Sequence, residues 1–469
     1  MTLPGAYAIL PLALAASTGL ALVGLEGGRP RLARGLSIAG AFAQLVIALV
    51  AMVALREGAP LAFQWCPWPS GAGLTLFLDP LAAWLLAVTA VLALIAATVG
   101  DARSAAPAPR PSWLQFQLVA LNGLLLVSDL VSFAACLLLA WGLAWRLSHA
   151  RDGMPHGRVV LAVGASTLAA AVGGLYAAVG TFDFAGLAIA APAVPAADAW
   201  LPTGVGFALA AVFTLASAAA PLVFSSSPSV GPLILNGALV AGALYALTRL
   251  FTLVFPCFVA GPCGPSGLVL PLALSLVSGG ALATLVAGRS RDVGEWLAVF
   301  AIGVALVAVG SFRAAGLGAA LVLMTNAMLA SVVLVLARPI ESQRLGSVLR
   351  LLALAALLGL PPLPGFLGSV ALLRASGPDA LAVWTLVLGG MLLAVAGVVR
   401  ASRARDAAPV AASGPAVPAL GAALALLALV AAAGPALDYG LRAARQILDR
   451  NTYVTAVATA RGRAPPDRG

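Results

Sequence analysis

The chain has 469 residues, of which 62% are hydrophobic and only 9% charged, and its mean hydropathy is +1.06. A soluble domain needs a polar surface, so this composition excludes one and predicts an all-α protein that crosses a membrane many times. The formal net charge of +10 comes entirely from arginine, because the sequence contains no lysine. These arginines are spread over loops without a basic aromatic patch, which excludes nucleic-acid binding and assigns them to topology and to anionic lipids.

A membrane helix needs about 20 apolar residues, and runs of this kind recur along the whole chain. They lie at about 4–24, 36–54, 80–100, 112–127, 128–147, 158–180, 203–223, 231–251, 267–287, 293–311, 314–337, 347–373, 381–399 and 416–434. We therefore expect about 14 transmembrane helices. The first run lacks a basic start, so it predicts a first span and no cleavable signal peptide.

The placement of arginine predicts how the helices are oriented, because short cytoplasmic loops collect positive charge. Counted from the N-terminus, the odd-numbered connections hold sixteen arginines and the even-numbered ones four. This predicts a multi-pass protein of the bacterial inner membrane with its N-terminus outside. The tail after the last span would then also lie outside, although it carries six arginines, which the rule does not favour.

Proline marks two of the predicted spans. In the segment Gly359–Ser369, GLPPLPGFLGS, the prolines Pro361, Pro362 and Pro364 interrupt an otherwise continuous apolar run. Each proline removes a backbone donor and clashes with the preceding turn, so we expect a discontinuous twelfth helix. Pro221 predicts a similar break in the seventh.

The four cysteines form no metal motif, and we expect neither a metal nor a cofactor. Cys257 and Cys263 lie six residues apart in the eighth connection, within a turn-rich segment. This connection falls on the predicted outer side of the membrane, where disulfides persist. The spacing and the topology therefore predict a possible disulfide between these two residues.

GLPPLPGFLGS resembles the G-[IL]-P-P-x-x-G-F-x-x-K signature of the proton-antiporter-like membrane subunits shared by respiratory complex I, group 4 membrane hydrogenases and Mrp-type cation/proton antiporters. The resemblance covers about residues 110–460. It includes Asp129-Leu-Val-Ser before an apolar run, Gly180-Thr-Phe-Asp183, Tyr245-x-x-x-Arg249, and Arg291-Asp292-Val-Gly-Glu295. The tail, from Ala433-Gly-Pro to Tyr453-Val-Thr-Ala-Val457, is similar to the ending of the Mrp D-type branch.

The resemblance implies a fold of two inverted five-helix repeats, with one discontinuous helix in each, the seventh and the twelfth. The corresponding segments are three N-terminal helices in 1–105, the first repeat in 112–251, the second repeat in 267–399, a last helix in 416–434 and an amphipathic basic tail in 435–469.

The resemblance also implies an ion path built from buried lysines and a glutamate, but this chain has neutral residues at those places. They are Leu138 for the glutamate, Ala216, Ala241, Gly294, Ala330 and Ser369 for lysines, and Asn326 for a histidine. Asp129, Asp292 and Glu295 remain as residual acids. Each lies near the end of a predicted span, where the expected surrounding is a solvated helix terminus.

Three functions are consistent with these residues. The first is a structural or docking subunit with a degenerate proton path, held among other membrane subunits of a complex I-like, hydrogenase-like or antiporter assembly. The second is an active translocating subunit that uses waters and the residual acids. The third is a solute transporter with a site at the broken helices. No nucleotide or redox-cofactor motif occurs, so the chain is not catalytic by itself and any oxidoreductase chemistry would reside in partner subunits.

Overall fold

The computed structural model describes residues 4–66, 74–99, 110–148, 155–195, 198–224, 230–255, 265–288, 290–337, 340, 342–377, 380–403 and 416–462. Nearly all of them are helical, which confirms the all-α polytopic class. The disulfide predicted between Cys257 and Cys263 lies outside the described residues.

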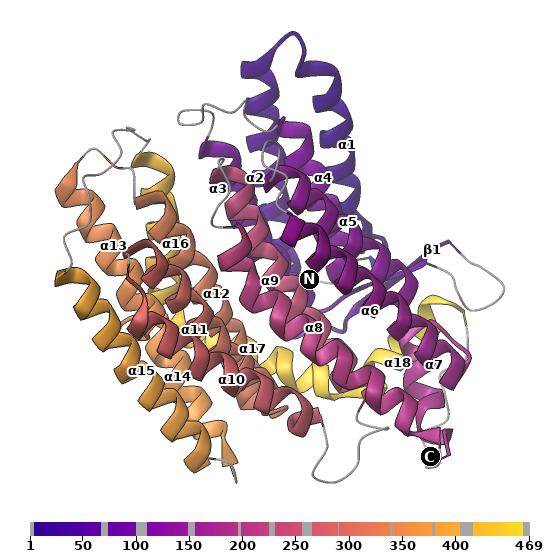
Figure 1. Ribbon diagram of the computed structural model, residues 1–469. Coiled ribbons are helices and arrows are strands. Elements are labelled where there is room, and N and C mark those ends of the chain that lie inside the picture. The colour runs from indigo at the N-terminus through magenta and orange to yellow at the C-terminus, as the bar shows by residue number, and fades with distance from the viewer. Residues whose placement is uncertain are drawn as a thin grey trace.

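Most of the helices run side by side as long rods (Figure 1). The N-terminal group is a 3-10 turn at Gly5–Ile9 with α1 (Leu10–Leu25), α2 (Pro30–Leu55) and α3 (Pro80–Val99). The next is α4 (Pro111–Leu126), α5 (Leu130–Ser148), α6 (Pro155–Val179), the short α7 (Phe184–Ala190) with a 3-10 turn at Ala191–Ala193, α8 (Trp200–Phe224) and α9 (Val230–Leu253). Then come α10 (Pro265–Val286), α11 (Ser290–Gly310), α12 (Ala314–Ala337), α13 (Gln343–Leu358), α14 (Pro364–Ala375), α15 (Ala380–Arg403), α16 (Ala416–Ala431), α17 (Ala433–Leu448) and α18 (Arg450–Ala460).

Proline and short polar side chains set where many of these helices begin. Proline suits the first helical position, because the N–H that it lacks would have no partner there. It opens α2, α3, α4, α6, α10 and α14. Asp183, Ser342 and Asp449 cap α7, α13 and α18 by accepting a backbone N–H, which replaces a hydrogen bond that the first turn cannot make internally.

The predicted break in the twelfth span is confirmed. α13 ends at Leu358, and Gly359 follows with φ +70°, a left-handed conformation that glycine adopts without strain. The N–H of Leu360 donates to the carbonyl of Ala355 at 3.0 Å, closing the helix end. Pro361 and Pro362 cannot continue the hydrogen-bond ladder, and the chain restarts as α14 at Pro364.

The predicted break in the seventh span is wrong. α8 runs without interruption from Trp200 to Phe224 and includes Pro221. Because this proline lies in the last turn, it deletes one hydrogen bond close to a helix end, where the ladder stops in any case. The same residue type that breaks the twelfth span in its middle is thus tolerated in α8.

Nine helices among the described residues are long and apolar enough to cross a membrane, and a tenth candidate is the pair α16 and α17, bent by 75°. Several other predicted spans are shorter: α4 and α13 have 16 residues each and α14 has 12. The chain is therefore a multi-pass membrane protein, whereas the count of 14 and the two inverted repeats stay predictions.

A β-ribbon that the sequence did not predict lies between α2 and α3. β1 (Leu61–Cys66) and β2 (Leu74–Leu78) pair antiparallel, with Leu61 opposite Leu78 and Phe63 opposite Leu76. Most of β2 is buried. The ribbon carries the backbone directly into Asp79 at the start of α3, and so it positions the first charged residue of the site described below.

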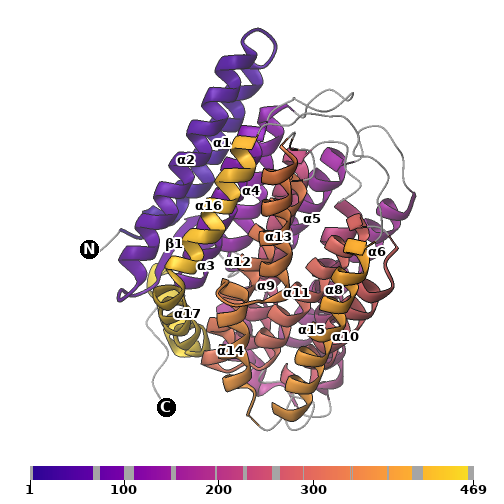
Figure 2. The ribbon, with the colours of Figure 1, turned by 90° about the vertical axis from the view of Figure 1, so that its left-hand side faces the viewer.

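The most buried helices form the centre of the molecule, and amphipathic helices close one end. α3, α11 and α12 are buried along nearly their whole length, whereas α1, α2, α10 and α15 expose much of their surface. α16 runs down to α17 (Figure 2). α17 and α18 then cross one end of the bundle (Figure 1), where α17 contacts α12, α3 and α9, and α18 contacts α7 and β1.

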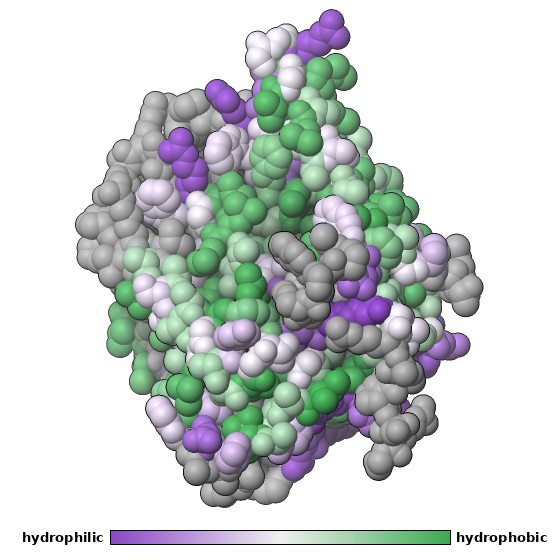
Figure 3. Space-filling model, turned by 90° about the vertical axis from the view of Figure 1, so that its right-hand side faces the viewer, coloured by the Kyte–Doolittle hydropathy of each residue, from purple (hydrophilic) through white to green (hydrophobic). Residues whose placement is uncertain are grey.

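The surface fits a membrane environment. Apolar residues are spread over much of the face shown in Figure 3, and hydrophilic residues lie toward its top and bottom and in a patch right of centre. Large exposed apolar side chains lie on the outer helices, among them Phe42 of α2, Leu392 of α15 and Leu424 of α16. Such side chains are stable next to lipid or to another membrane helix.

Candidate functional site

The positions at which the resemblance implies an ion path are neutral and mostly buried. Ala241 on α9 and Ala330 on α12 are completely buried, and Gly294 on α11 is buried as well. Leu138, Ala216 and Ser369 are partly buried. Asn326 is the only one with a buried polar side chain, and its amide donates to the carbonyl of Ala356 in α13 at 2.9 Å.

Charged side chains gather instead at one end of the bundle, beneath α17 and α18. We call this group the charge cluster, and it consists of Asp79, Asp129, Asp183, Arg249 and Arg461. The first four of these are the charged residues that are fully buried among the described part of the chain. The side chain of Arg461 is 6% exposed.

The first ion pair of the charge cluster joins α3 to α9. Arg249 pairs with Asp79, and both side chains are 2% exposed. Asp79 also caps α3, because its Oδ1 accepts the N–H of Ala82 at 2.9 Å. Three aromatic rings surround the guanidinium of Arg249, with centroids at 5.1 Å for Phe77, 5.2 Å for Tyr245 and 5.4 Å for Tyr453. Cation–π attraction partly replaces the water that this guanidinium has lost.

The second ion pair fastens the end of α18. Arg461 binds Asp183 in a bidentate manner, with Nη1 to Oδ2 and Nη2 to Oδ1 both at 2.9 Å. Its Nε and Nη2 also donate to the hydroxyl of Thr75 in β2 at 3.1 Å. The planar fork of arginine matches a carboxylate in this geometry. Arg461 therefore links α18 to the start of α7 and to the β-ribbon.

Asp129 completes the charge cluster at the start of α5, and it forms no ion pair with any residue that the structure describes. Its backbone forms a β-bridge with that of Asp183. Its Oδ1 accepts the N–H of Ser132 at 2.7 Å, whereas Oδ2 is buried without a hydrogen-bond partner. Burial raises the pKa of the Asp129 carboxyl, and the negative charge of Asp183 raises it further, against the hydrogen bonds from Ser132 and Val131 that lower it.

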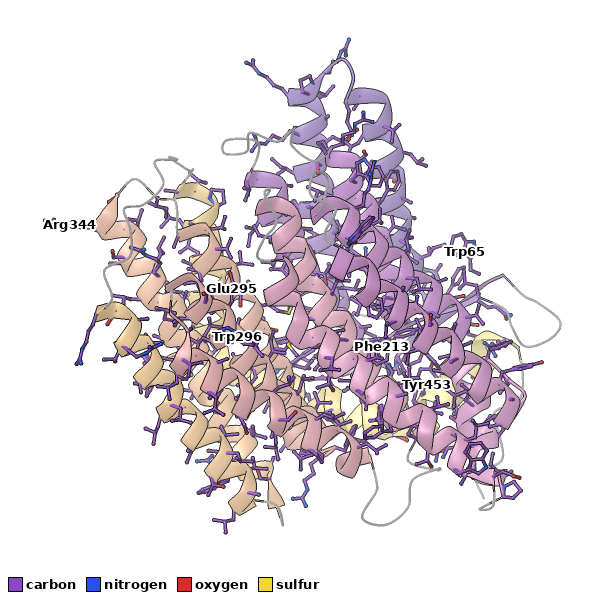
Figure 4. All side chains as sticks on the ribbon, in the orientation of Figure 1. Trp65, Phe213, Glu295, Trp296, Arg344 and Tyr453 are labelled. Carbon is purple, nitrogen blue, oxygen red and sulfur yellow. The ribbon has the colours of Figure 1, made fainter. Side chains whose placement is uncertain are left out.

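Backbone contacts hold the segments of the charge cluster together. Ser128 donates from both its N–H and its hydroxyl to the carbonyl of Thr75, each at 3.0 Å. The N–H of Phe184 donates to the carbonyl of Ser128 at 3.0 Å. The ring of Tyr453 on α18 packs on Phe77 with a centroid distance of 4.3 Å. Figure 4 shows Tyr453 at this end of the molecule.

The charge cluster joins motifs that the sequence showed only separately. Asp129, Asp183, Arg249 and Tyr453 each belong to a recognised motif, but no pattern in the sequence indicates that they meet. Asp79 and Arg461 were not singled out. Asp79 precedes Pro80 at the start of an apolar run, which is a recognisable helix-start pattern; Arg461 carries no such signal.

The expectation of solvated helix ends for the residual acids is wrong for Asp129, which is 3% exposed. The β-ribbon, which was not predicted, lies beside it, since the neighbouring Ser128 donates to the carbonyl of Thr75. Asp292 in the first turn of α11 and Glu295 are partly exposed. Glu295 lies toward the end of the molecule that carries Arg344, away from Tyr453 (Figure 4), so the structure does not bring these two acids to Asp129.

The described residues hold no group of three or more His, Cys, Asp or Glu side chains that could bind a metal ion. The charge cluster offers carboxylates that are already paired with guanidinium groups, together with one carboxyl that has a free oxygen. Its chemistry is therefore that of ion pairing and of proton binding.

No protein-family model and no curated protein matches the sequence. Solved structures do match its fold. A chain of the membrane-bound sulfane sulfur reductase, an archaeal respiratory membrane complex, has 18% identity and a TM-score of 0.83 over 96% of this chain and 99% of its own. A chain of the Mrp complex from Dietzia sp. DQ12-45-1b has 20% identity and 0.78 over 97% and 100%. A chain of respiratory complex I from Thermus thermophilus has 21% identity and 0.74 over 95% and 99%.

The protein therefore has the fold of the antiporter-like membrane subunits, as the sequence motifs predicted. Identities near one fifth establish the fold alone. Because all three complexes match over nearly the full length of the chain, the comparison does not single out the Mrp D-type branch.

Proposed function

We propose that this chain is an integral membrane subunit of a multisubunit complex of the respiratory or Mrp kind, in which it serves as a scaffold and docking element. The observation that carries the proposal is the complete burial of Ala241 and Ala330 at positions where the resembled family has lysine. A proton path through a membrane needs groups that change charge at modest cost, and buried lysine does so readily. Methyl groups cannot.

The distribution of the remaining charge supports the same proposal. The fully buried charged residues of the described chain lie beneath α17 and α18, and two arginines neutralise two of the three acids. Buried ion pairs of this kind hold two segments of the chain together. Protonating one carboxylate would leave its arginine buried without a partner, so these pairs are poorly suited to repeated protonation. The charge cluster thus acts as a fastening between the C-terminal helices and the first half of the chain.

The second candidate is a subunit that conducts protons through ordered waters. Buried side-chain oxygens without a hydrogen-bond partner favour it, namely Oε1 of Gln115 and Gln117, Oδ1 of Asn326, and Oγ1 of Thr89 and Thr214. Polar atoms of this kind are the partners that buried waters require. In that case Asp129 and Asp292 would be the acids through which protons enter and leave.

Reconstitution separates these two candidates. The complex purified with this subunit, carrying Asp129→Asn together with Asp292→Asn, is placed in proteoliposomes and its ion transport per turnover is measured. Asparagine can still cap α5, so assembly is preserved. If the subunit is a scaffold, the double variant should transport as many ions per turnover as the unaltered complex. Asp198→Asn, at an exposed acid of the sixth connection, is the matched control. Loss of coupling in the assembled double variant, with the control unaffected, would replace the first candidate by the second.

We also propose that the N-terminus and the tail lie outside the cytoplasm. Among the described connections, the side chains of the tail bond to even-numbered ones: Glu57 and Thr75 in the second and Asp183 in the sixth. These are the connections poor in arginine. An impermeant thiol reagent added from outside should label Thr455→Cys on α18 and leave Gly28→Cys in the first connection unlabelled. The reverse pattern would overturn this orientation.

A further inference from the structure

The charge cluster contains one carboxyl more than it has guanidinium groups to neutralise. Asp79 is paired with Arg249 and Asp183 with Arg461. Arg461 uses both terminal nitrogens on Asp183, and its Nε and Nη2 also donate to Thr75. Neither arginine forms an ion pair with Asp129, which is 3% exposed and has a buried Oδ2 without a partner. An isolated carboxylate in such a place is costly, and the usual remedy is to take up a proton.

We propose that Asp129 is a proton-binding site: its carboxyl is neutral at pH 7, with the proton on Oδ2, and it holds this proton as long as α18 covers it. The ligand is a single proton, and the site is formed by the start of α5, the start of α7 and the end of α18. The proposal concerns a resident proton and does not depend on whether the chain conducts protons across the membrane.

The groups that surround Asp129 support a neutral carboxyl. Asp183 faces it from the start of α7 and repels a second negative charge. Tyr453 on α18 is buried, which raises its pKa well above its ordinary value, so it stays neutral. Cys136, one turn further along α5 from Ser132, is a free and partly buried thiol. None of these supplies a positive charge to Asp129.

One feature of the site favours the ionised form. Asp129 lies at the N-terminus of α5, where the helix dipole and backbone N–H groups stabilise a negative charge, and Oδ1 accepts the N–H of Ser132. A neutral carboxyl keeps this hydrogen bond, because its carbonyl oxygen also accepts. Burial outweighs the helix start, and the pKa of Asp129 is raised.

The resident proton is coupled to the seating of α18. When α18 lifts away, water reaches Asp129. The pKa of the Asp129 carboxyl then returns to its ordinary value of about 3.9. The covered state thus has the higher pKa. Seating is fully favourable below the ordinary value and weakens as the pH rises toward the raised value, by up to about tenfold in the opening equilibrium per pH unit. Above the raised value, an ionised Asp129 repels Asp183 and weakens the anchor of Arg461.

Infrared difference spectroscopy tests the proton directly. The full chain in lipid at pH 7 is compared with Asp129→Asn, and the unaltered protein should show one additional band of a protonated carboxylic acid. Asp129→Ser, which also keeps a capping side chain, should lose the same band, and Asp292→Asn should keep it. A difference spectrum with a carboxylate band in place of the acid band would overturn the proposal.

Amide hydrogen exchange tests the coupling. After correction for the intrinsic rate, exchange in α18 of the unaltered chain should accelerate as the pH is raised from 5 to 8, and in Asp129→Asn it should be independent of pH. Asp292→Asn should behave as the unaltered chain. Equal pH dependence in the unaltered chain and in both Asp129 variants would overturn the coupling, even if the infrared band is present.

Discussion

The middle of the helix bundle and its end beneath α17 and α18 differ in one property, the presence of charge. In the middle, Ala241 and Ala330 are buried among other small and apolar side chains. At the end, three aspartates and two arginines are buried within a few turns of one another. Both regions are equally shielded from water, so burial alone did not remove charge from this protein.

The comparison teaches that the buried arginines of this chain are kept where each is paired with an aspartate and fixes the position of a helix. Each arginine of the charge cluster binds a carboxylate that also caps a helix, Asp79 on α3 and Asp183 on α7. Removing one partner of such a pair strands the other in a medium without water. In the middle of the bundle a lone charge would have no comparable partner, and small neutral residues occupy its place.

The largest effect should follow from breaking the Arg249–Asp79 pair. Arg249→Met leaves the carboxylate of Asp79 buried without a partner and should lower the free energy of unfolding by about 3–5 kcal/mol. The measurement is equilibrium unfolding in mixed micelles. The double variant Arg249→Met with Asp79→Asn removes both charges and keeps the α3 cap, so it should recover most of the loss. If the double variant is as unstable as the single one, the loss arises from packing and the comparison between the regions fails.

Placing a charge in the middle should have the next largest effect. Ala330→Lys introduces an unpaired ammonium at a fully buried position of α12, which costs about 2.5–3.5 kcal/mol on insertion scales. Ala330→Met matches the length without the charge, so the difference between the two variants isolates the charge. That difference should shrink as the pH rises, because the neutral amine is tolerated. A difference that does not depend on pH would mean that the lysine finds a partner or water in the interior.

A smaller effect is expected for a single neutral hydrogen bond near the charge cluster. The hydroxyl of Tyr439 on α17 donates to the carbonyl of Pro80 at 3.2 Å, and the ring stacks on Trp84 with centroids 5.7 Å apart. Tyr439→Phe keeps the ring and should lower the free energy of unfolding by about 1 kcal/mol. The same unfolding titration measures this change. A loss of unfolding free energy as large as that of Arg249→Met would show that neutral hydrogen bonds also hold α17 to this end of the bundle.

The smallest effect should come from the exposed ion pairs of the tail. Arg442 on α17 pairs with Asp438 at 2.9 Å and with Glu57 at 3.4 Å, all three at the surface. Water and salt screen such pairs, so Arg442→Gln should leave the unfolding curve unchanged at both low and high ionic strength. A clear loss of stability at low salt alone would show that these surface ion pairs help to hold the tail on the bundle.

Several parts of the fold and of the site were predictable from the sequence because their causes are local. The apolar runs predict membrane helices, and the cluster of Pro361, Pro362 and Pro364 predicts the gap between α13 and α14. Pro221 shows the limit of the same rule, since its effect depends on where α8 ends. The β-ribbon was missed because its strands are only six and five residues long, and their pairing is decided by contacts between segments.

The sequence by itself determined that this protein lies in a membrane, that its twelfth span is interrupted and that lysine is absent from its interior, because composition and proline chemistry act within one segment. Only the tertiary structure decided that Asp79, Asp129, Asp183, Arg249 and Arg461 meet. These residues come from segments as far apart as α3 and the end of α18, and each looks like an ordinary helix-end charge in its own segment. Whether such a charge is solvated or buried depends on what packs over it, and here that cover is the β-ribbon and α18.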